Sequence, residues 1–144
     1  MVKPTVLLVE DNEDDAELVM RAFRRAGVAN PLQHVVDGDQ AVAYLGGSGP
    51  YADRVLHPRP GLVLLDLKLP RRSGFEVLQW LRGRPETRRL PVVVLTSSDD
   101  NSDIGRAYDL GANSYLVKPV ATDALSDMAH TLGLYWLRLN QAAE

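Results

Sequence analysis

Cysteine is absent from the 144 residues of the chain. Its absence excludes disulfide bonds, thiolate metal sites and cysteine nucleophiles, and it fits the cytoplasm. No apolar run approaches the roughly 20 residues that a membrane-spanning helix requires. The first apolar run follows Met1–Pro4 directly, which leaves no room for a signal peptide. We therefore expect a cytoplasmic protein that does not enter a membrane.

Excess charge, internal repeats and an interdomain linker are also lacking. The formal net charge is −3, which argues against general binding to nucleic acid. Hydrophobic residues make up 45% and charged residues 24%, the balance of a globular protein large enough to bury a core. The sequence accordingly predicts a single domain over residues 1–144.

Short apolar runs are the dominant pattern in what is present. Runs of this kind are typical of parallel strands that helices cover on both faces. They are Val6–Val9, Leu62–Leu65, Val92–Leu95 and Tyr115–Val117, with a shorter strand expected at Gln33–Val36. Helical patterns and caps alternate with them, at Ala16–Ala26, Asp39–Leu45, Ser73–Arg82, before Gly111 and from Thr122, which is expected to cap the last helix. This alternation predicts an α/β fold with a doubly wound, five-stranded parallel sheet.

Polar residues follow four of these strands, at the sheet edge where parallel sheets bind ligands. Glu10 and Asp11 follow the first strand, Asp66 the third, Thr96 the fourth and Lys118 the fifth. Three carboxylates repel one another unless a divalent cation is bound, and oxygen ligands suit Mg²⁺ or Mn²⁺. The hydroxyl and the ammonium could hold an anion beside that cation. Together they predict phosphoryl transfer to Asp66.

Each of these residues also has an ordinary interpretation. The acidic pair and Asn12–Asp15 could simply begin a helix, and Asp66 could be a turn residue before Pro70. Thr96 could merely end a strand, and Lys118 could be a solvated charge. Their joint placement at four strand ends favours the functional interpretation.

The same residues carry a resemblance to a known family. The motifs are Val6-Leu7-Leu8-Val9-Glu10-Asp11-Asn12, Leu65-Asp66-Leu67-Lys68-Leu69-Pro70, Val94-Leu95-Thr96-Ser97 and Val117-Lys118-Pro119. Over nearly its whole length the chain resembles the receiver domains of bacterial two-component response regulators, which have a flavodoxin-like fold. The resemblance implies that Asp66 accepts a phosphoryl group from a sensor histidine kinase. The protein would then be a signalling phosphoacceptor and not an enzyme, with self-phosphorylation from small donors and self-dephosphorylation.

The resemblance also implies the roles of the other site residues. Asp11 and Asp66 would bind Mg²⁺ directly, the backbone carbonyl of Lys68 would be a third ligand, and Glu10 would act through water. Thr96 and Lys118 would hold two phosphoryl oxygens.

Two further features follow from the resemblance near the end of the fifth strand. Tyr115 would be the aromatic switch residue, occupying the space that Thr96 vacates on phosphorylation. The peptide bond between Lys118 and Pro119 would be cis, as is usual in this family.

The loop Gly46–Gly61 and the end Leu132–Leu139 look like those of single-domain regulators associated with phytochrome-type photoreceptor kinases. The residues after Lys118 suffice for one helix, so no output domain is expected. The protein would then act through protein partners and not DNA, among them a downstream phosphotransfer protein.

Two other functions share parts of this pattern. A dehalogenase-type phosphatase would need a second acidic residue two positions after Asp66, where the chain has Lys68. A flavin-binding protein of the same fold would need a hydroxyl- and glycine-rich loop after the first strand, where the chain has Glu10 and Asp11.

The last helix suggests assembly. An inward stripe of Leu125, Met128, Ala129, Leu132 and Tyr135 or Trp136 would cover the sheet, leaving Leu134, Leu137 and also Trp136 outside it. Exposed apolar clusters with an aromatic residue often mark interfaces. We expect a homodimer through the fourth helix, fifth strand and fifth helix; the alternative is that the helix end folds back over its own domain.

Overall fold

The structure is a computed structural model that describes residues 3–119 and 122–140. Five parallel strands form one sheet, as expected from the sequence, and their order is β2-β1-β3-β4-β5. The strands are β1 Thr5–Val9, β2 Leu32–Val35, β3 Pro60–Leu65, β4 Val92–Thr96 and β5 Ser114–Val117. The helices are α1 Glu13–Arg25, α2 Gly38–Gly46, α3 Gly74–Arg82, α4 Asn101–Asp109 and α5 Thr122–Leu134. The doubly wound α/β fold is therefore confirmed.

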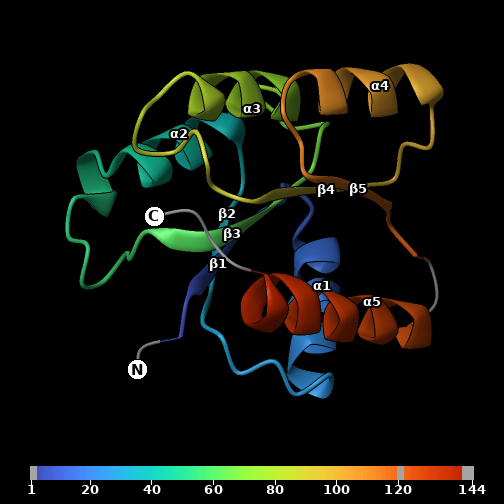
Figure 1. Cartoon of the computed structure of the whole chain (residues 1–144). Coiled ribbons are helices and arrows are strands. Elements are labelled where there is room, and N and C mark those ends of the chain that lie inside the picture. Colours follow the sequence, from blue (N-terminus) through green and yellow to red (C-terminus); the bar gives the residue numbers. More distant parts are fainter. Residues whose placement is uncertain (1–2, 120–121, 141–144) are drawn as a thin grey trace.

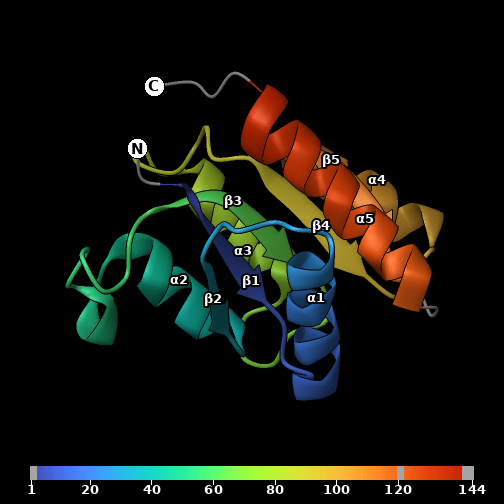
Figure 2. The same cartoon turned by 90° about the horizontal axis from the view of Figure 1, so that it is seen from below.

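Helices cover both faces of the sheet, with α2, α3 and α4 on one side and α1 and α5 on the other (Figures 1 and 2). Successive strand residues point to opposite faces, so each strand contributes to two cores. Leu7 and Val9 of β1 belong to the core under α2, α3 and α4, whereas Val6 and Leu8 belong to the core under α1 and α5. This explains why the strands read as continuous apolar runs.

The helix starts follow from capping residues. Asn12 caps α1, its Oδ1 accepting the backbone N–H of Asp15 at 2.9 Å. Ser73 and Glu76 form the expected capping box at α3. Asp37 caps α2, which therefore begins at Gly38, one residue before the expected start. The expected cap at Thr122 lies outside the described side chains, although α5 begins at that residue.

The long loop between α2 and β3 is held by Arg54. Its guanidinium donates to the carbonyls of Tyr44 at 2.8 Å, Leu45 at 3.0 Å and His57 at 3.1 Å. Two of these carbonyls, those of Tyr44 and Leu45, lie in the last turn of α2, where the helix supplies no N–H four residues further along. The N–H of Gly47 also donates to the Tyr44 carbonyl, at 3.1 Å. The short 3₁₀ helix Gly49–Tyr51 lies within the same loop. The loop is thus tied to the helix that precedes it.

The last helix differs from expectation at its end. After α5 the chain forms a π-helical segment, Tyr135–Leu139, which changes the positions of side chains relative to an α-helical period. Trp136 and Leu137 consequently contact the core and are partly buried, whereas Leu134 and Tyr135 are exposed. The expectation of a solvent-exposed Leu137 was therefore wrong. Within the described residues, no helix is long and apolar enough to cross a membrane.

Candidate functional site

Asp66 directly follows β3, the central strand of the sheet. It is only 6% exposed, and its N–H donates to the carbonyl of Val9 on β1 at 3.1 Å. Helix α3 begins close beside it, because the N–H of Gly74 donates to the carbonyl of Leu67 at 2.9 Å. A Cβ atom at residue 74 would lie 2.2 Å from the carbonyl oxygen of Asp66. Only glycine allows this approach.

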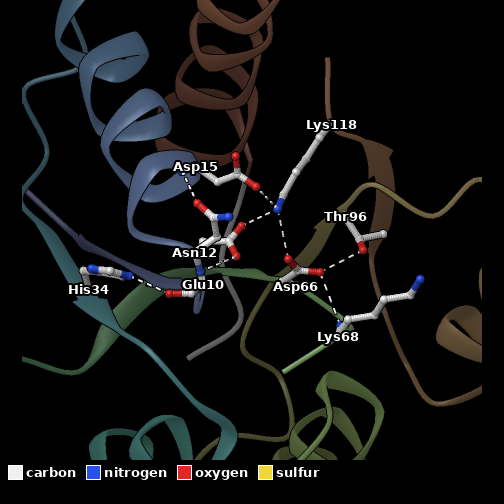
Figure 3. Close-up of polar contacts among 8 residues, drawn as sticks. All are labelled: Glu10, Asn12, Asp15, His34, Asp66, Lys68, Thr96 and Lys118. Carbon is white, nitrogen blue, oxygen red and sulfur yellow. Dashed lines mark hydrogen bonds and ion pairs between the residues drawn. The ribbon is translucent and has the colours of Figure 1, made fainter. Parts of the chain in front are cut away.

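One oxygen of the Asp66 carboxylate accepts two hydrogen bonds. The buried hydroxyl of Thr96 donates to Oδ1 at 2.8 Å, and the backbone N–H of Lys68 donates to the same atom at 3.3 Å. The side chain of Lys68 extends away from the carboxylates (Figure 3). The structure thus brings Thr96 against Asp66 and leaves only the backbone of Lys68 at the site.

The ammonium of Lys118 lies among three carboxylates (Figure 3). Its Nζ donates to Glu10 Oε1, to Asp66 Oδ2 at 3.0 Å and to Asp15 Oδ2 at 3.0 Å. Burial alone lowers the pKa of this ammonium, but hydrogen bonds to Glu10, Asp66 and Asp15 outweigh burial and raise it. Lys118 is therefore charged in the folded protein.

Glu10 is buried at the end of β1. Its Oε2 accepts the backbone N–H of Asn12 at 3.2 Å, and His34 Nε2 on β2 lies 2.7 Å from its carbonyl oxygen. Burial raises the pKa of Glu10 to about 7; repulsion from Asp66 adds to this rise, while hydrogen bonds from Lys118 and Asn12 oppose it. A cation at this carboxylate would relieve the cost of burying its charge.

Glu10, Asp11 and Asp66 can hold a divalent cation. Each offers a carboxylate oxygen, and these oxygens all lie within 4.8 Å of one another. Hard oxygen donors of this kind suit Mg²⁺ or Mn²⁺. The residues fit the metal that the sequence pattern predicts.

Tyr115 lies on β5, beside β4. Its phenol donates a hydrogen bond of 2.8 Å to the carbonyl of Ser98 in the segment that follows β4. Burial raises the pKa of this phenol; the bond to Ser98 lowers it, and the nearby carboxylates of Asp103, Asp100 and Asp66 raise it. The tyrosine is therefore a neutral donor attached to the loop beyond Thr96.

The expected cis bond before Pro119 was wrong. No cis peptide bond occurs in residues 3–119 and 122–140, so the bond between Lys118 and Pro119 is trans. The trans form is intrinsically favoured by about 0.5–1 kcal/mol even before proline. The Lys118 side chain reaches its three carboxylates with this bond trans.

Two contributors to the site could not be recognised in the sequence. Asp15 was grouped with the residues that begin α1, and only the fold brings it to Lys118. Gly74 is part of an ordinary helix start in the sequence, and its closeness to Asp66 depends on how α3 meets β3. Neither position has a local sequence signal that separates it from its neighbours.

Known proteins are similar to this chain over most of its length. A sequence profile described as "Response regulator receiver domain" matches residues 6–130. The chain is 40% identical over 140 residues to the probable methanogenesis regulatory protein FilR2 of Methanothrix harundinacea, covering 95% of this chain and 86% of that protein. It is 38% identical over 132 residues to the response regulator Rcp1 of Synechocystis, covering 92% and 88% respectively.

Solved structures are similar over the same length. The phosphorylated cyanobacterial phytochrome response regulator RcpA superposes with a TM-score of 0.91 at 36% identity, covering 99% of this chain and 100% of that chain. The Mn²⁺-bound form of Rcp1 superposes with a TM-score of 0.86 at 35% identity, covering 98% and 99%. The profile match and these identities span most of the sequence. The chain therefore belongs to the family of response regulator receiver domains.

Proposed function

We propose that this protein is a single-domain response regulator whose Asp66 accepts a phosphoryl group from a sensor histidine kinase. The observation that carries the proposal is the surroundings of one carboxylate. Asp66 contacts the hydroxyl of Thr96 and the ammonium of Lys118, and its oxygens lie near those of Glu10 and Asp11. A nucleophile, an anion-binding pair and a metal-binding group thus meet at the end of the central strand.

In the proposed reaction, an oxygen of Asp66 attacks the phosphorus of a phosphohistidine. A P–O bond forms, the P–N bond breaks, and the imidazole leaves with the electron pair. Lys118 and Thr96 would each give a hydrogen bond to a phosphoryl oxygen, because each already donates to one of the two Asp66 oxygens, Thr96 to Oδ1 and Lys118 to Oδ2. With a small donor such as acetyl phosphate, the P–O bond to the acetyl group would break instead and acetate would leave. Hydrolysis of the acyl phosphate would return the protein to its starting state.

Glu10, Asp11 and Asp66 would hold Mg²⁺ or Mn²⁺, with the backbone carbonyl of Lys68 as a further ligand. The similarity to the Mn²⁺-bound form of Rcp1 supports this assignment. When bound, the cation would supply positive charge for an incoming phosphate. Without it, the carboxylates of Glu10, Asp11, Asp15 and Asp66 repel that phosphate.

The conformational switch would pass through Thr96 and Tyr115. Phosphorylation would draw the Thr96 hydroxyl from Asp66 toward the phosphoryl group, and the Tyr115 ring would move into the vacated space. The phenol would then lose its bond to the carbonyl of Ser98. This would alter the surface formed by α4, β5 and α5.

The partners would be proteins and not DNA. Similarity to a phytochrome response regulator supports a phytochrome-type kinase as the phosphoryl donor, with a downstream phosphotransfer protein as a candidate acceptor in a phosphorelay. The net charge of −3 gives no general attraction to nucleic acid. The Lys68 side chain, which extends away from the site, supplies no second acid for a dehalogenase-type reaction.

A homodimer would use the face made by α4, β5 and α5. Exposed apolar side chains lie on α4 and β5, at Tyr108 and Val117. Tyr135, which directly follows α5, is also exposed, lines a groove with Leu116 of β5 and packs edge-on against Trp136. A second copy covering these residues would bury apolar surface that is otherwise in water.

The central experiment is phosphoryl uptake from acetyl phosphate with Mg²⁺, measured by intact mass. Wild-type protein should gain one phosphoryl group, and Asp66→Asn should gain none. Asp109→Asn, which changes an exposed carboxylate on α4, should behave as wild type. Equal uptake by Asp66→Asn would contradict the proposal.

A further inference from the structure

Lys118 has no free donor in this structure. An ammonium group has three N–H bonds, and those of Lys118 are matched by Glu10 Oε1, Asp15 Oδ2 and Asp66 Oδ2. A phosphoryl oxygen can bind this ammonium only if one of the three carboxylates gives up its hydrogen bond.

The three carboxylates are not equivalent. Glu10 and Asp66 belong to the group of oxygens that can hold a cation, whereas Asp15 does not. A cation at that group would weaken the hold of Glu10 and Asp66 on Lys118 by competing for the same oxygens. Formation of the acyl phosphate would also remove the negative charge of the Asp66 carboxylate. Asp15 alone would keep its full attraction for the ammonium.

Asp15 is also fixed in place. Its backbone N–H donates to the Asn12 side chain that caps α1, so the carboxylate projects from the first turn of the helix. Its side chain is 40% exposed, so it is not needed to fill the core. The contact connects α1 with the residue that follows β5, two elements far apart in the sequence.

We propose that Asp15 is a positioning residue that competes with the phosphoryl group for Lys118 and so weakens phosphoryl binding at Asp66. The inference rests on the proposed function and goes beyond it, because it assigns a regulatory contact to a residue outside the metal and phosphoryl ligands. Removing the Asp15 charge frees one Lys118 donor and removes one source of repulsion for the incoming anion.

The test is the affinity for beryllium fluoride, a phosphoryl mimic, measured by calorimetry at saturating Mg²⁺. Asp15→Asn should bind it about fivefold more tightly than wild type, a typical coupling between contacting groups. Asp14→Asn is the matched control, because it removes the same charge from the neighbouring exposed position in the first turn of α1. Its affinity should change less than about twofold. Equal changes in the two variants, or weaker binding by Asp15→Asn, would overturn the inference.

A double-mutant cycle separates competition for Lys118 from a general charge effect. In the Lys118→Met background, Asp15→Asn should have no more effect than Asp14→Asn, and a gain that persists there would overturn the inference. Thermal unfolding of each variant checks that the fold is kept. If wild-type protein fails to bind beryllium fluoride, the proposed function fails and the inference with it. If wild type binds and Asp15→Asn is unchanged, only the inference fails.

Discussion

The phenol of Tyr115 donates a 2.8 Å hydrogen bond to the carbonyl of Ser98, two residues beyond the Thr96 hydroxyl that contacts Asp66. The tyrosine is thus connected to the carboxylate through one short segment of chain. Ser98 is further held by its own hydroxyl, which donates to Asp103 on α4 at 2.7 Å. A displacement of Thr96 would therefore move Ser98, the hydrogen-bond partner of Tyr115, before it moves the rest of the surface formed by α4, β5 and α5.

Tyr115→Phe should loosen the segment after β4. It removes one hydrogen bond and leaves the ring in place, so we expect a loss of about 1 kcal/mol in the free energy of unfolding. Amide exchange should become faster in residues 97–100, measured by mass spectrometry. Tyr108→Phe, which alters an exposed phenol on α4, should change neither quantity. Unchanged exchange in Tyr115→Phe would show that the Ser98 contact does not hold the segment.

Metal binding should depend on Asp11. Asp11→Asn removes a carboxylate from the group of oxygens within 4.8 Å, so Mg²⁺ affinity in calorimetry should fall by at least about tenfold. Asp14→Asn, which lies outside that group, should retain wild-type affinity. Excess chelator should abolish phosphoryl uptake by wild-type protein. Full uptake in chelator would contradict the metal assignment.

Lys118→Met should separate metal binding from the response to a phosphoryl mimic. The ammonium occupies oxygens of Glu10 and Asp66, so its removal should leave Mg²⁺ affinity unchanged or raise it. The same variant should lose the change in amide exchange that beryllium fluoride causes in wild type, because no ammonium then donates to a fluoride. A normal change in amide exchange would show that Lys118 is only a counter-ion to the carboxylates and is not needed for the response.

The α2–β3 loop should lose its anchor in Arg54→Met. Three backbone carbonyls would lose a charged donor, and two of them end a helix. We expect a loss of about 2 kcal/mol in urea unfolding and faster proteolysis within residues 47–59. Arg59→Met, an exposed position in the same loop, serves as the control. Equal stability of the two variants would show that Arg54 does not anchor the α2–β3 loop.

Dimer formation is testable by light scattering at micromolar concentration. Wild type should have the mass of a dimer, and Tyr135→Glu should be monomeric because it places a charge beside β5 in the proposed interface. Leu56→Glu, at an exposed apolar position of the α2–β3 loop, should remain dimeric. If wild-type protein is monomeric both free and with beryllium fluoride, the proposed homodimer is contradicted. A dimer that survives Tyr135→Glu would place the interface elsewhere.

The amino-acid sequence by itself determined the strands and the main site. Strands buried on both faces must be apolar throughout, so the runs ending before Glu10, Asp66 and Thr96 could be recognised without tertiary information. Parallel strands end at one edge of the sheet, which made it possible to predict that these residues lie together. The Ser73 capping box was equally predictable, because it satisfies local backbone donors.

Tertiary structure alone decided which further residues reach the site and which face of the last helix is covered. Glu13, Asp14 and Asp15 are equivalent acids in sequence, and only the angle at which α1 leaves the sheet brings Asp15 to Lys118. Leu137 contacts the core because the chain leaves α-helical periodicity after Leu134, a change that the residue pattern does not encode. Contacts between distant segments depend on how whole elements pack, whereas strand ends and caps depend on neighbours along the chain.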